Sequence, residues 1–280
     1  MTVLLALGTG FLAGRLAWVA LGATLMTPAL RRENHRGRAV ATAGGMVVVV
    51  AVLVVEAGRV VAESAGLGGD PPGARRLAVL AAAVGFGLLG LFDDTAGSGD
   101  ARGFRGHLAS AARGTLTSGG VKLLGGACLG IVLVGPWADA GAGALQLVAD
   151  GALVAAAANL ANLFDRAPGR AGKAAIAAFA VLAVATAADH RLAAAAVVIG
   201  AGTALLLDDL RERVMLGDTG ANVLGAVLGL AVVQVCVPSV RLVVLAVVLA
   251  ANLASEVISF SRVIDAVPPL RALDRAGRRP

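Results

Sequence analysis

The strongest constraint on the fold of this chain is a series of long apolar runs separated by short charged segments. A helix needs about 20 mostly apolar residues to cross a bilayer, and these runs have that length. Backbone polar groups in lipid must be paired within the chain, so such runs indicate helices rather than loops. The short alternating segments typical of a transmembrane β-barrel are absent from the sequence. The sequence therefore predicts an all-α, polytopic transmembrane helix bundle of about nine spans, near residues 2–27, 40–62, 76–92, 121–137, 145–164, 172–188, 191–207, 220–236 and 240–260.

The composition agrees with a membrane protein that forms one domain over residues 1–280. Hydrophobic residues make up 58% of the chain and charged residues only 15%, which would leave a soluble domain without a polar surface. No repeat, linker or low-complexity tail divides the sequence. The run 2–27 lacks a basic leader and is longer than the apolar core of a cleaved signal peptide, so we expect it to be the first span.

Lysine and arginine are distributed unevenly between the expected spans, and this predicts the orientation of the chain. If the N-terminus is outside, the inner segments hold 18 of the 24 basic residues, an excess typical of cytoplasmic loops. We therefore expect a plasma-membrane protein with its N-terminus outside and its C-terminus in the cytoplasm. The net charge of +6 then reflects topology, and nucleic acid is not an expected partner. The inner segments are 28–39, 93–122, 164–173, 208–219 and 261–280.

Acidic residues gather at the inner ends of the expected spans, where a charge is costly and usually functional. Four of them are candidates for function, namely Asp93, Asp94, Asp165 and Asp218. Three others have Arg211 and Arg213 beside them, and ion pairing in a solvated loop is the simpler interpretation for Asp208, Asp209 and Glu212.

Asp93 and Asp94 end the third apolar run, in the segment Gly90-Leu-Phe-Asp-Asp. Adjacent carboxylates repel each other unless they share a cation. Mg²⁺ suits such a pair because it takes hard oxygen ligands and keeps waters that a phosphate can replace. The pair is therefore a candidate metal site, with Mn²⁺ as the alternative ion.

Asn159, Asn162 and Asp165 recur every three residues at the inner end of the fifth run. This spacing places them on one flank of a helix, where they could hold a nucleotide, a sugar or a phosphate–metal group. Polar contact between helices is the alternative interpretation. Pro168 and Gly169 then break the helix and could expose backbone N–H groups.

The segment Leu216-Gly-Asp-Thr-Gly-Ala-Asn222 opens the eighth run. Glycines on both sides of Asp218 allow close approach of the backbone to a ligand, and the N-terminus of the following helix favours an anion. An ordinary N-cap turn is the alternative explanation for Asp218 or Thr219 alone.

Basic residues on the same side complete a candidate site for an anion. Arg38 lies in a basic stretch before Thr42-Ala-Gly-Gly45, and Lys122 begins the fourth run. Topology explains each of them alone, but together they could surround an anionic ligand. Arg15, near the middle of the first run, is expected to pair with Glu56 or Glu256 or to extend to the interface. The inner-loop histidines, His35 and His107, have no metal-binding spacing and are expected on the surface.

At these residues the sequence resembles the polyprenyl-phosphate N-acetylhexosamine-1-phosphate transferases of glycosyltransferase family 4. This group includes phospho-N-acetylmuramoyl-pentapeptide transferase and the N-acetylglucosamine-1-phosphate transferases. The resemblance covers most of the chain, and the motifs occur in family order. The matching segments are Arg38 to Gly45, Asp93-Asp94, Lys122, the N-x-x-N-x-x-D motif at Asn159, Asn162 and Asp165, and the G-D-T-G segment within Leu216 to Gly220.

The resemblance implies a Mg²⁺-dependent transfer of a sugar-1-phosphate from a UDP-sugar to polyprenyl phosphate at the cytoplasmic face of the membrane. The products would be a polyprenyl-diphosphate-sugar and UMP, in peptidoglycan or other surface-glycan biosynthesis. Asp218 is implied as a magnesium ligand, with Asp93 and Asp94 as further ligands and catalytic groups. The implied partners are the lipid, the UDP-sugar and the membrane, and a homodimer is left open. The implied substrate-binding residues include Arg38, Lys122, Asn159, Asn162 and Asp165.

The chain departs from the family pattern in its inner loops. Pro168 stands where the family has a further acid, which is linked to the uracil end of the donor. Arg271-Ala-Leu273 follows Pro268-Pro-Leu270 where the family has a histidine cluster, and the chain ends inside without the family's final span. Basic replacements suggest that an anionic ligand is still bound, and they add Arg170 and Arg271 to the expected binding residues, with Arg166 beside them.

Two other functions stay open. A catalytically inert relative that binds polyprenyl phosphate or a partner protein would account for the missing histidines. A transporter would need acids along a path across the membrane, whereas the acids of this sequence cluster on one side.

Overall fold

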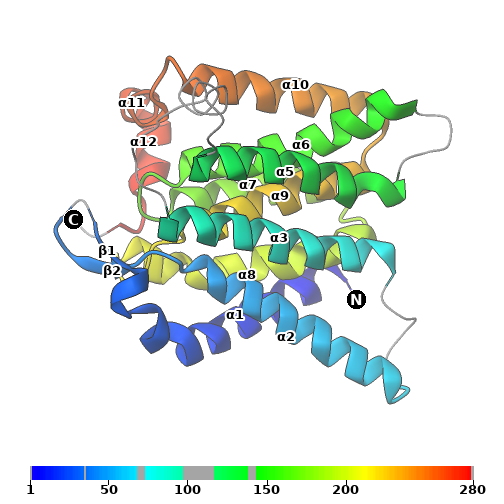
Figure 1. The fold of residues 1–280 in the computed structure, drawn as a ribbon, viewed down its shortest axis with the longest axis horizontal. Helices are drawn as coiled ribbons and strands as arrows, with labels where there is room; N and C mark the ends of the chain where they lie inside the picture. Colours follow the sequence, from blue (N-terminus) through cyan, green and yellow to red (C-terminus); the bar gives the residue numbers. More distant parts are fainter. Residues whose placement is uncertain (1, 35, 68–72, 97–116, 138–142, 279–280) are drawn as a thin grey trace.

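Each of the nine expected spans coincides with a helix in the computed structural model, which describes residues 2–34, 36–67, 73–96, 117–137 and 143–278. The long helices lie roughly side by side as one bundle (Figure 1). Predicted and observed ends differ by a few residues, as expected when apolar runs are used to place helix boundaries. The helices are α1 (Val3–Leu25), α2 (Gly45–Ser64), α3 (Ala74–Ala96), α5 (Ser118–Val134), α6 (Gly143–Phe164), α7 (Arg170–Ala185), α8 (Ala193–Leu210), α9 (Gly217–Val235) and α10 (Pro238–Ser255).

Eight of the helices in the described part of the chain are long and apolar enough to cross a membrane. The other long helix, α7, has 16 residues, so it is only about 24 Å long at 1.5 Å per residue. That length is below the roughly 30 Å of a hydrocarbon core. The protein is therefore an all-helical bundle of membrane-spanning type, in which α7 is too short for an upright crossing.

Local sequence signals set several of the helix ends. The hydroxyl of Thr2 accepts a hydrogen bond from the backbone of Leu5, and that of Thr117 accepts one from Gly120, so each caps the first turn of its helix. Pro238 occupies the first turn of α10, where its missing N–H costs nothing.

Small residues let the helices approach closely, as the composition suggested. A Cβ atom added to Gly10 of α1 would lie 2.0 Å from the carbonyl oxygen of Val197 in α8, and one added to Gly200 would lie 2.2 Å from that of Leu7. Of these eight helices, α8 and α9 are the most enclosed, because 78% of the residues in the most apolar stretch of each are buried. In α10 the corresponding share is 0%. The core of the bundle therefore sits on α8 and α9, and α10 presents its apolar side chains outward, as a lipid-facing helix does.

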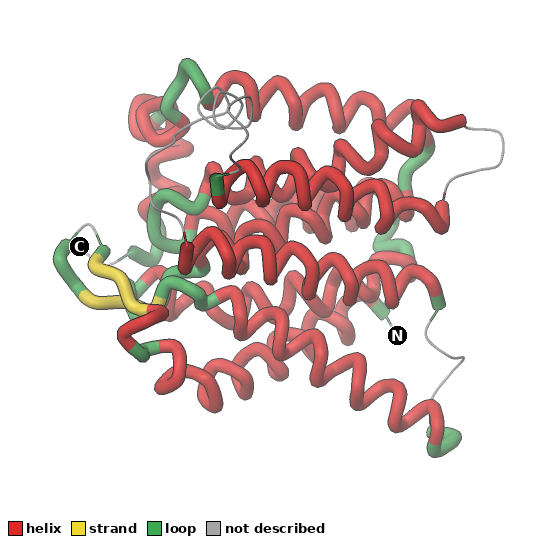
Figure 2. Tube along the Cα trace, viewed as in Figure 1, coloured by secondary structure: helices red, strands yellow, loops and turns green. Residues whose placement is uncertain are grey.

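One end of the bundle carries short elements that the apolar pattern did not predict. Strands β1 (Arg31–Glu33) and β2 (Ala39–Ala41) form an antiparallel hairpin, in which Arg32 lies opposite Val40. Helices α11 (Phe260–Ala266) and α12 (Pro268–Arg275) follow α10 at the same end, which also holds the C-terminus (Figures 1 and 2). The N-terminus lies at the other end (Figure 1). Three single 3₁₀ turns complete the described elements, at Pro28–Leu30, Gly135–Trp137 and His190–Leu192.

The glutamate partners expected for Arg15 and the solvated loop expected for three acids were wrong. Arg15 pairs with neither Glu56 nor Glu256, because its Nη1 lies 2.5 Å from Oδ2 of Asp208 and also donates to the carbonyl of Ala204. The acids expected in a solvated loop are buried instead, with 4%, 6% and 9% of their surface exposed for Asp208, Asp209 and Glu212. The expected ion pairing survives only between Arg213 and Asp208, at 3.2 Å.

Candidate functional site

Three charged side chains from distant parts of the chain meet at the end of the bundle that carries the hairpin. Asp93 lies in the last turns of α3, Lys122 in the first turns of α5 and Asp218 in the first turn of α9. The ammonium of Lys122 lies 2.7 Å from Oδ2 of Asp93 and 2.5 Å from Oδ2 of Asp218. These side chains are mostly shielded from solvent, with exposures of 13%, 17% and 27% for Lys122, Asp93 and Asp218. The structure thus brings together three of the predicted site residues around one cationic centre.

Asn162 adds an uncharged donor to this cluster. Its side-chain amide, from the last turns of α6, donates to Oδ2 of Asp218 at 3.1 Å. The same carboxylate oxygen therefore receives hydrogen bonds from Lys122 and Asn162. These bonds fix the orientation of the Asp218 side chain relative to α5 and α6.

Asp94, although adjacent to Asp93, makes different contacts. Its Oδ1 accepts a hydrogen bond from the backbone N–H of Asp218, and its Oδ2 accepts from the N–H and the hydroxyl of Thr219, at 3.0, 2.9 and 2.6 Å. A carboxylate at this place satisfies the first free N–H groups of α9 and faces the positive end of the helix. Asp94 thus acts here as a cap contributed by another helix, and its role as a metal ligand stays a prediction.

The glycine-rich motifs are explained by close contact between backbones. A Cβ atom on Gly45 would lie 2.0 Å from the backbone nitrogen of Gly220, and one on Gly90 would lie 2.4 Å from the carbonyl oxygen of Asp218. Gly217 has a φ of +70°, and a Cβ there would lie 1.9 Å from the carbonyl oxygen of Thr42. The close approach expected between these glycines and a ligand is thus used by the protein's own chain.

Backbone hydrogen bonds connect the same two segments. The N–H of Met215 donates to the carbonyl of Ala41, and the N–H groups of Gly44 and Gly45 donate to the carbonyls of Met215 and Leu216. The segment before α2 and the segment before α9 therefore form one rigid unit. This unit presents Asp218 to α3, α5 and α6.

The three polar residues of the N-x-x-N-x-x-D motif have separate partners. Asn159 donates to the side-chain oxygen of Asn252 in α10, so it provides the polar contact between helices that was the alternative expectation. Asn162 contacts Asp218, as described above. Asp165 accepts a hydrogen bond from the backbone of Gly217. The motif therefore links α6 both to α10 and to the segment that begins α9.

Burial raises the pKa of Asp165 well above its usual range, and the nearby carboxylates of Asp209 and Asp218 raise it further. The hydrogen bond from Gly217 opposes this change without cancelling it. A carboxyl group in such a place is costly to charge unless a cation or a ligand donor compensates its charge. Asp165 is thus prepared to bind a group that brings positive charge or hydrogen-bond donors.

Asp165 lines a pocket of about 230 Å³ that has both polar and apolar walls. Its walls include the acids Asp209 and Glu212, which the sequence analysis did not assign to the site. The only available signal was that Asp208-Asp209 ends an apolar run in the way Asp93-Asp94 does. The other lining residues are Glu33, Asn34, Val40, Arg166, Ala167, Pro168, Val214 and Met215.

The arginines expected to bind an anion do not join the cluster. Arg38 is exposed at the turn between β1 and β2, and Arg271 is exposed on α12, where it donates to the carbonyl of Asp265. Arg170 is buried and paired with Asp274. Their assignment as binding residues stays a prediction, and His35 and His107 lie outside the described residues.

The chemistry of the cluster fits a divalent cation bound together with phosphate. In the described ranges, no three His, Cys, Asp or Glu side chains are grouped so as to hold a metal ion. However, Asp93 and Asp218 both direct an oxygen at the Lys122 ammonium, so a positive charge is already stabilised between them. Mg²⁺ is commonly held by one or two carboxylates, with substrate phosphates and water filling its other positions. Asp93 and Asp218 therefore form a suitable pair of ligands.

Comparison with known proteins supports the assignment suggested by these motifs. No curated protein sequence matches the chain. A family model described as glycosyl transferase family 4 matches residues 76–236, which include the cluster of Asp93, Lys122, Asn162 and Asp218 but not Arg38 or Arg271. The match covers more than half of the 280 residues, and the chain therefore belongs to glycosyl transferase family 4, a family of phospho-sugar transferases.

Proposed function

We propose that the protein transfers a sugar-1-phosphate from a UDP-sugar to polyprenyl phosphate at the cytoplasmic face of the plasma membrane. The observation that carries this proposal is the cluster of Asp93, Lys122 and Asp218 at one end of the bundle, in a chain of this transferase family. In the reaction, an oxygen of the lipid phosphate forms a bond to the phosphorus that carries the sugar. The bond from that phosphorus to the bridging oxygen breaks, and UMP leaves.

Both substrates are anions, so the site must offset the repulsion between them. Asp93 and Asp218 would hold Mg²⁺, with Mn²⁺ as an alternative, and the ion would stabilise negative charge on the transferred and leaving phosphates. Lys122 would then move its ammonium from the two carboxylates towards a phosphate oxygen, where it supplies a second positive charge. Asn162 holds Asp218 in place during this exchange of partners.

The neighbouring pocket suits the uncharged part of the donor. Asp165, Asp209 and Glu212 offer oxygen atoms that accept hydrogen bonds from the hydroxyl and N–H groups of a nucleoside or a sugar. Asp165 contacts the segment that carries Asp218, so a donor bound here would have its phosphates near the cluster.

A position at the end of the bundle also suits the lipid substrate. The phosphate of a polyprenyl chain stays at the membrane interface while its hydrocarbon lies in the bilayer. The cluster lies at the ends of apolar helices, so it could receive that phosphate without drawing it into the membrane core.

The test is UMP release by purified protein supplied with polyprenyl phosphate, Mg²⁺ and a panel of UDP-sugars. We expect Asp218→Asn to lower the rate by at least about 100-fold, because the charge that holds the metal is lost. The control is Asp189→Asn, which removes a carboxylate from the turn before α8, at the other end of that helix from the site. Release that survives in Asp218→Asn, or that needs no divalent cation, would refute the proposal.

The alternative is a catalytically inert relative that binds polyprenyl phosphate or a partner protein. Two observations favour it, since Lys122 pairs with both candidate metal ligands and Arg271-Ala-Leu273 replaces the histidines expected after Pro268-Pro-Leu270. Binding of polyprenyl phosphate without UMP release from any donor would select this alternative. The family assignment gives no support to a transporter.

A further inference from the structure

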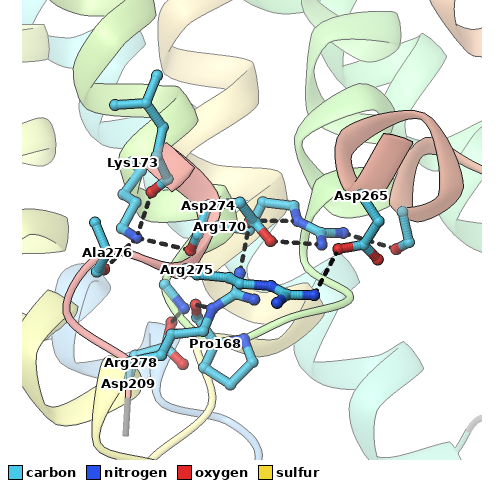
Figure 3. A network of polar contacts seen from close by, with 12 residues as sticks. Pro168, Arg170, Lys173, Asp209, Asp265, Asp274, Arg275, Ala276 and Arg278 are labelled. Carbon is cyan, nitrogen blue, oxygen red and sulfur yellow. Dashed lines mark hydrogen bonds and ion pairs between the residues drawn. The ribbon is translucent and has the colours of Figure 1, made fainter. Parts of the chain in front are cut away.

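The C-terminal arm, which we define as residues 256–278, is attached to the bundle by a network of polar contacts around one buried carboxylate. Asp274 is 7% exposed, although most other residues of α11 and α12 are exposed. Its two oxygens accept hydrogen bonds from Nε and Nη2 of Arg170, at 2.8 and 3.0 Å (Figure 3). This is the bidentate geometry that arginine forms with a carboxylate. The third nitrogen of the guanidinium, Nη1, donates to the hydroxyl of Ser261 in α11. Arg170 therefore binds both short helices of the arm.

Lys173, one turn further along α7, holds the end of the arm. Its ammonium donates to the carbonyl oxygens of Leu273, Asp274 and Ala276, at 3.0, 2.9 and 2.6 Å (Figure 3). These carbonyls belong to the last turn of α12 and to Ala276, the residue that follows it, where backbone acceptors have no partner within the helix. All three protons of the ammonium are thus used, and Lys173 closes α12 as a cap contributed by another helix.

The arm also contacts the wall of the pocket that Asp165 lines. Arg278 donates from Nη2 to Asp274 at 2.6 Å and from Nε to the carbonyl of Pro168 at 2.9 Å (Figure 3). The next residue, Gly169, donates its N–H to the carboxylate of Asp209. Pro168 and Asp209 both line the pocket. Asp274 is thus connected to the pocket in two ways. Arg278 contacts both Asp274 and Pro168. Arg170 contacts Asp274 and is the residue directly after Gly169.

The wall segment is a short connection whose shape depends on its neighbours. It lies between the end of α6 and the start of α7, and it contains Pro168 and Gly169, which has a φ of +71°. Gly169 can change its backbone angles at low cost, because it has no Cβ atom. A segment of this kind takes one conformation only when neighbouring groups fix it. At the start of the segment, Gly217 donates a hydrogen bond to Asp165. At its end, Leu206 and Leu210 lie against Gly169, Asp209 accepts from the N–H of Gly169, and the arm donates to the carbonyl of Pro168.

We propose that Asp274 is a positioning residue that, through Arg170 and Arg278, holds the segment Asp165–Gly169 in the conformation that binds the donor. The inference rests on the proposed function, because it assumes that the pocket next to Asp165 receives part of the UDP-sugar. It assigns Arg170 and Lys173 to binding the arm, so that neither contacts the anionic substrate. Burial raises the pKa of Asp274, but hydrogen bonds from Arg170 and Arg278 together lower it by a larger amount. The pKa of Asp274 is therefore below its ordinary value, and the carboxylate is charged at neutral pH.

The test uses the full-length protein with Asp274→Asn, and Asp265→Asn as the control. Asp265 lies in α11 of the same arm, but it is 53% exposed and pairs with the exposed Arg275. We expect Asp274→Asn to raise KM for the UDP-sugar about tenfold and to change kcat less than about twofold, because the binding wall loosens while the metal cluster stays intact. Hydrogen exchange of the backbone amides of residues 165–172 should become faster in Asp274→Asn and stay unchanged in Asp265→Asn. Asp274→Glu, which keeps the charge, should restore part of both effects.

Arg278→Gln is a milder variant that removes only the route through Pro168, so it should change KM and exchange in the same direction by a smaller factor. Unchanged exchange at residues 165–172 in Asp274→Asn, or a fall in kcat without a change in KM, would overturn the inference. The exchange measurement needs no turnover. If the wild-type protein releases no UMP, the proposed function fails, but local loosening in Asp274→Asn would still support the positioning role.

Discussion

At the scale of single residues, adjacent acids of one motif have separate tasks. Asp93 directs its carboxylate to Lys122, whereas Asp94 accepts three hydrogen bonds from the first residues of α9. Adjacent residues of a helix point about 100° apart, so the two carboxylates reach different neighbours. A paired-aspartate motif can therefore combine a chemical residue with a structural one, and substitutions should distinguish them.

We predict that Asp94→Asn destabilises the protein more than Asp218→Asn does. The amide at position 94 would place an NH₂ group against an N–H donor of Asp218 or Thr219, and losing such buried bonds costs about 1–3 kcal/mol. In Asp218→Asn, Lys122 keeps its pair with Asp93. The free energy of unfolding, measured for both variants in the same detergent, tests this. Equal losses would mean that Asp94 is not the main cap of α9.

At the scale of elements, glycine contacts decide how the site is assembled. Helix α9 meets α2 at Gly45 and Gly220 and meets α3 at Gly90, in each case with backbone against backbone. The short segments before α2 and α9 are also connected by hydrogen bonds. The distance of Asp218 from Asp93 and Lys122 therefore depends on residues that have no polar side chain.

We predict that Gly45→Ala lowers both stability and activity. The new methyl group would lie 2.0 Å from the backbone nitrogen of Gly220, so α2 and α9 must separate, and strain of this kind costs about 1–3 kcal/mol. The matched control is Gly58→Ala in the same helix, where a Cβ atom meets nothing within 4 Å. It should be neutral or slightly stabilising, because alanine favours the helix by about 1 kcal/mol over glycine. Thermal unfolding and UMP release of both variants check this, and equal behaviour would contradict the packing explanation.

At the scale of the whole molecule, the site, the hairpin and the C-terminal arm share one end of the bundle, and the N-terminus lies at the other (Figure 1). The basic residues of the sequence are concentrated in the segments that reach the site end. Such a distribution favours the cytoplasm as the compartment that faces the site. UDP-sugars are found there, so orientation and proposed function support each other.

We predict that an impermeant maleimide labels Leu67→Cys on intact cells but labels Arg211→Cys only after the membrane is opened. Both side chains are exposed, Leu67 just beyond the end of α2 and Arg211 between α8 and α9 at the site end. The native Cys128 and Cys236, which are free thiols, are first replaced by alanine. The reverse pattern would place the site outside the cell and would contradict the proposed donor.

The sequence by itself determined the long helices and the identity of most residues in the cluster. Apolar length and capping residues act locally, so the nine long helices of the described ranges could be placed from the order of the residues alone. The motifs at Asp93, Asn162 and Asp218 were visible because each lies at the end of an apolar run.

Only the tertiary structure decided which charged groups pair. Arg170 and Asp274 are 104 positions apart, and Arg15 and Asp208 are 193 apart, so no local pattern connects them. The choice between a solvated acid and a buried one likewise depends on the helices that surround it, as Asp209 illustrates. Helix formation follows from interactions a few residues apart, whereas the pairing of charges follows from packing, which brings distant residues within hydrogen-bonding distance only after the bundle has formed.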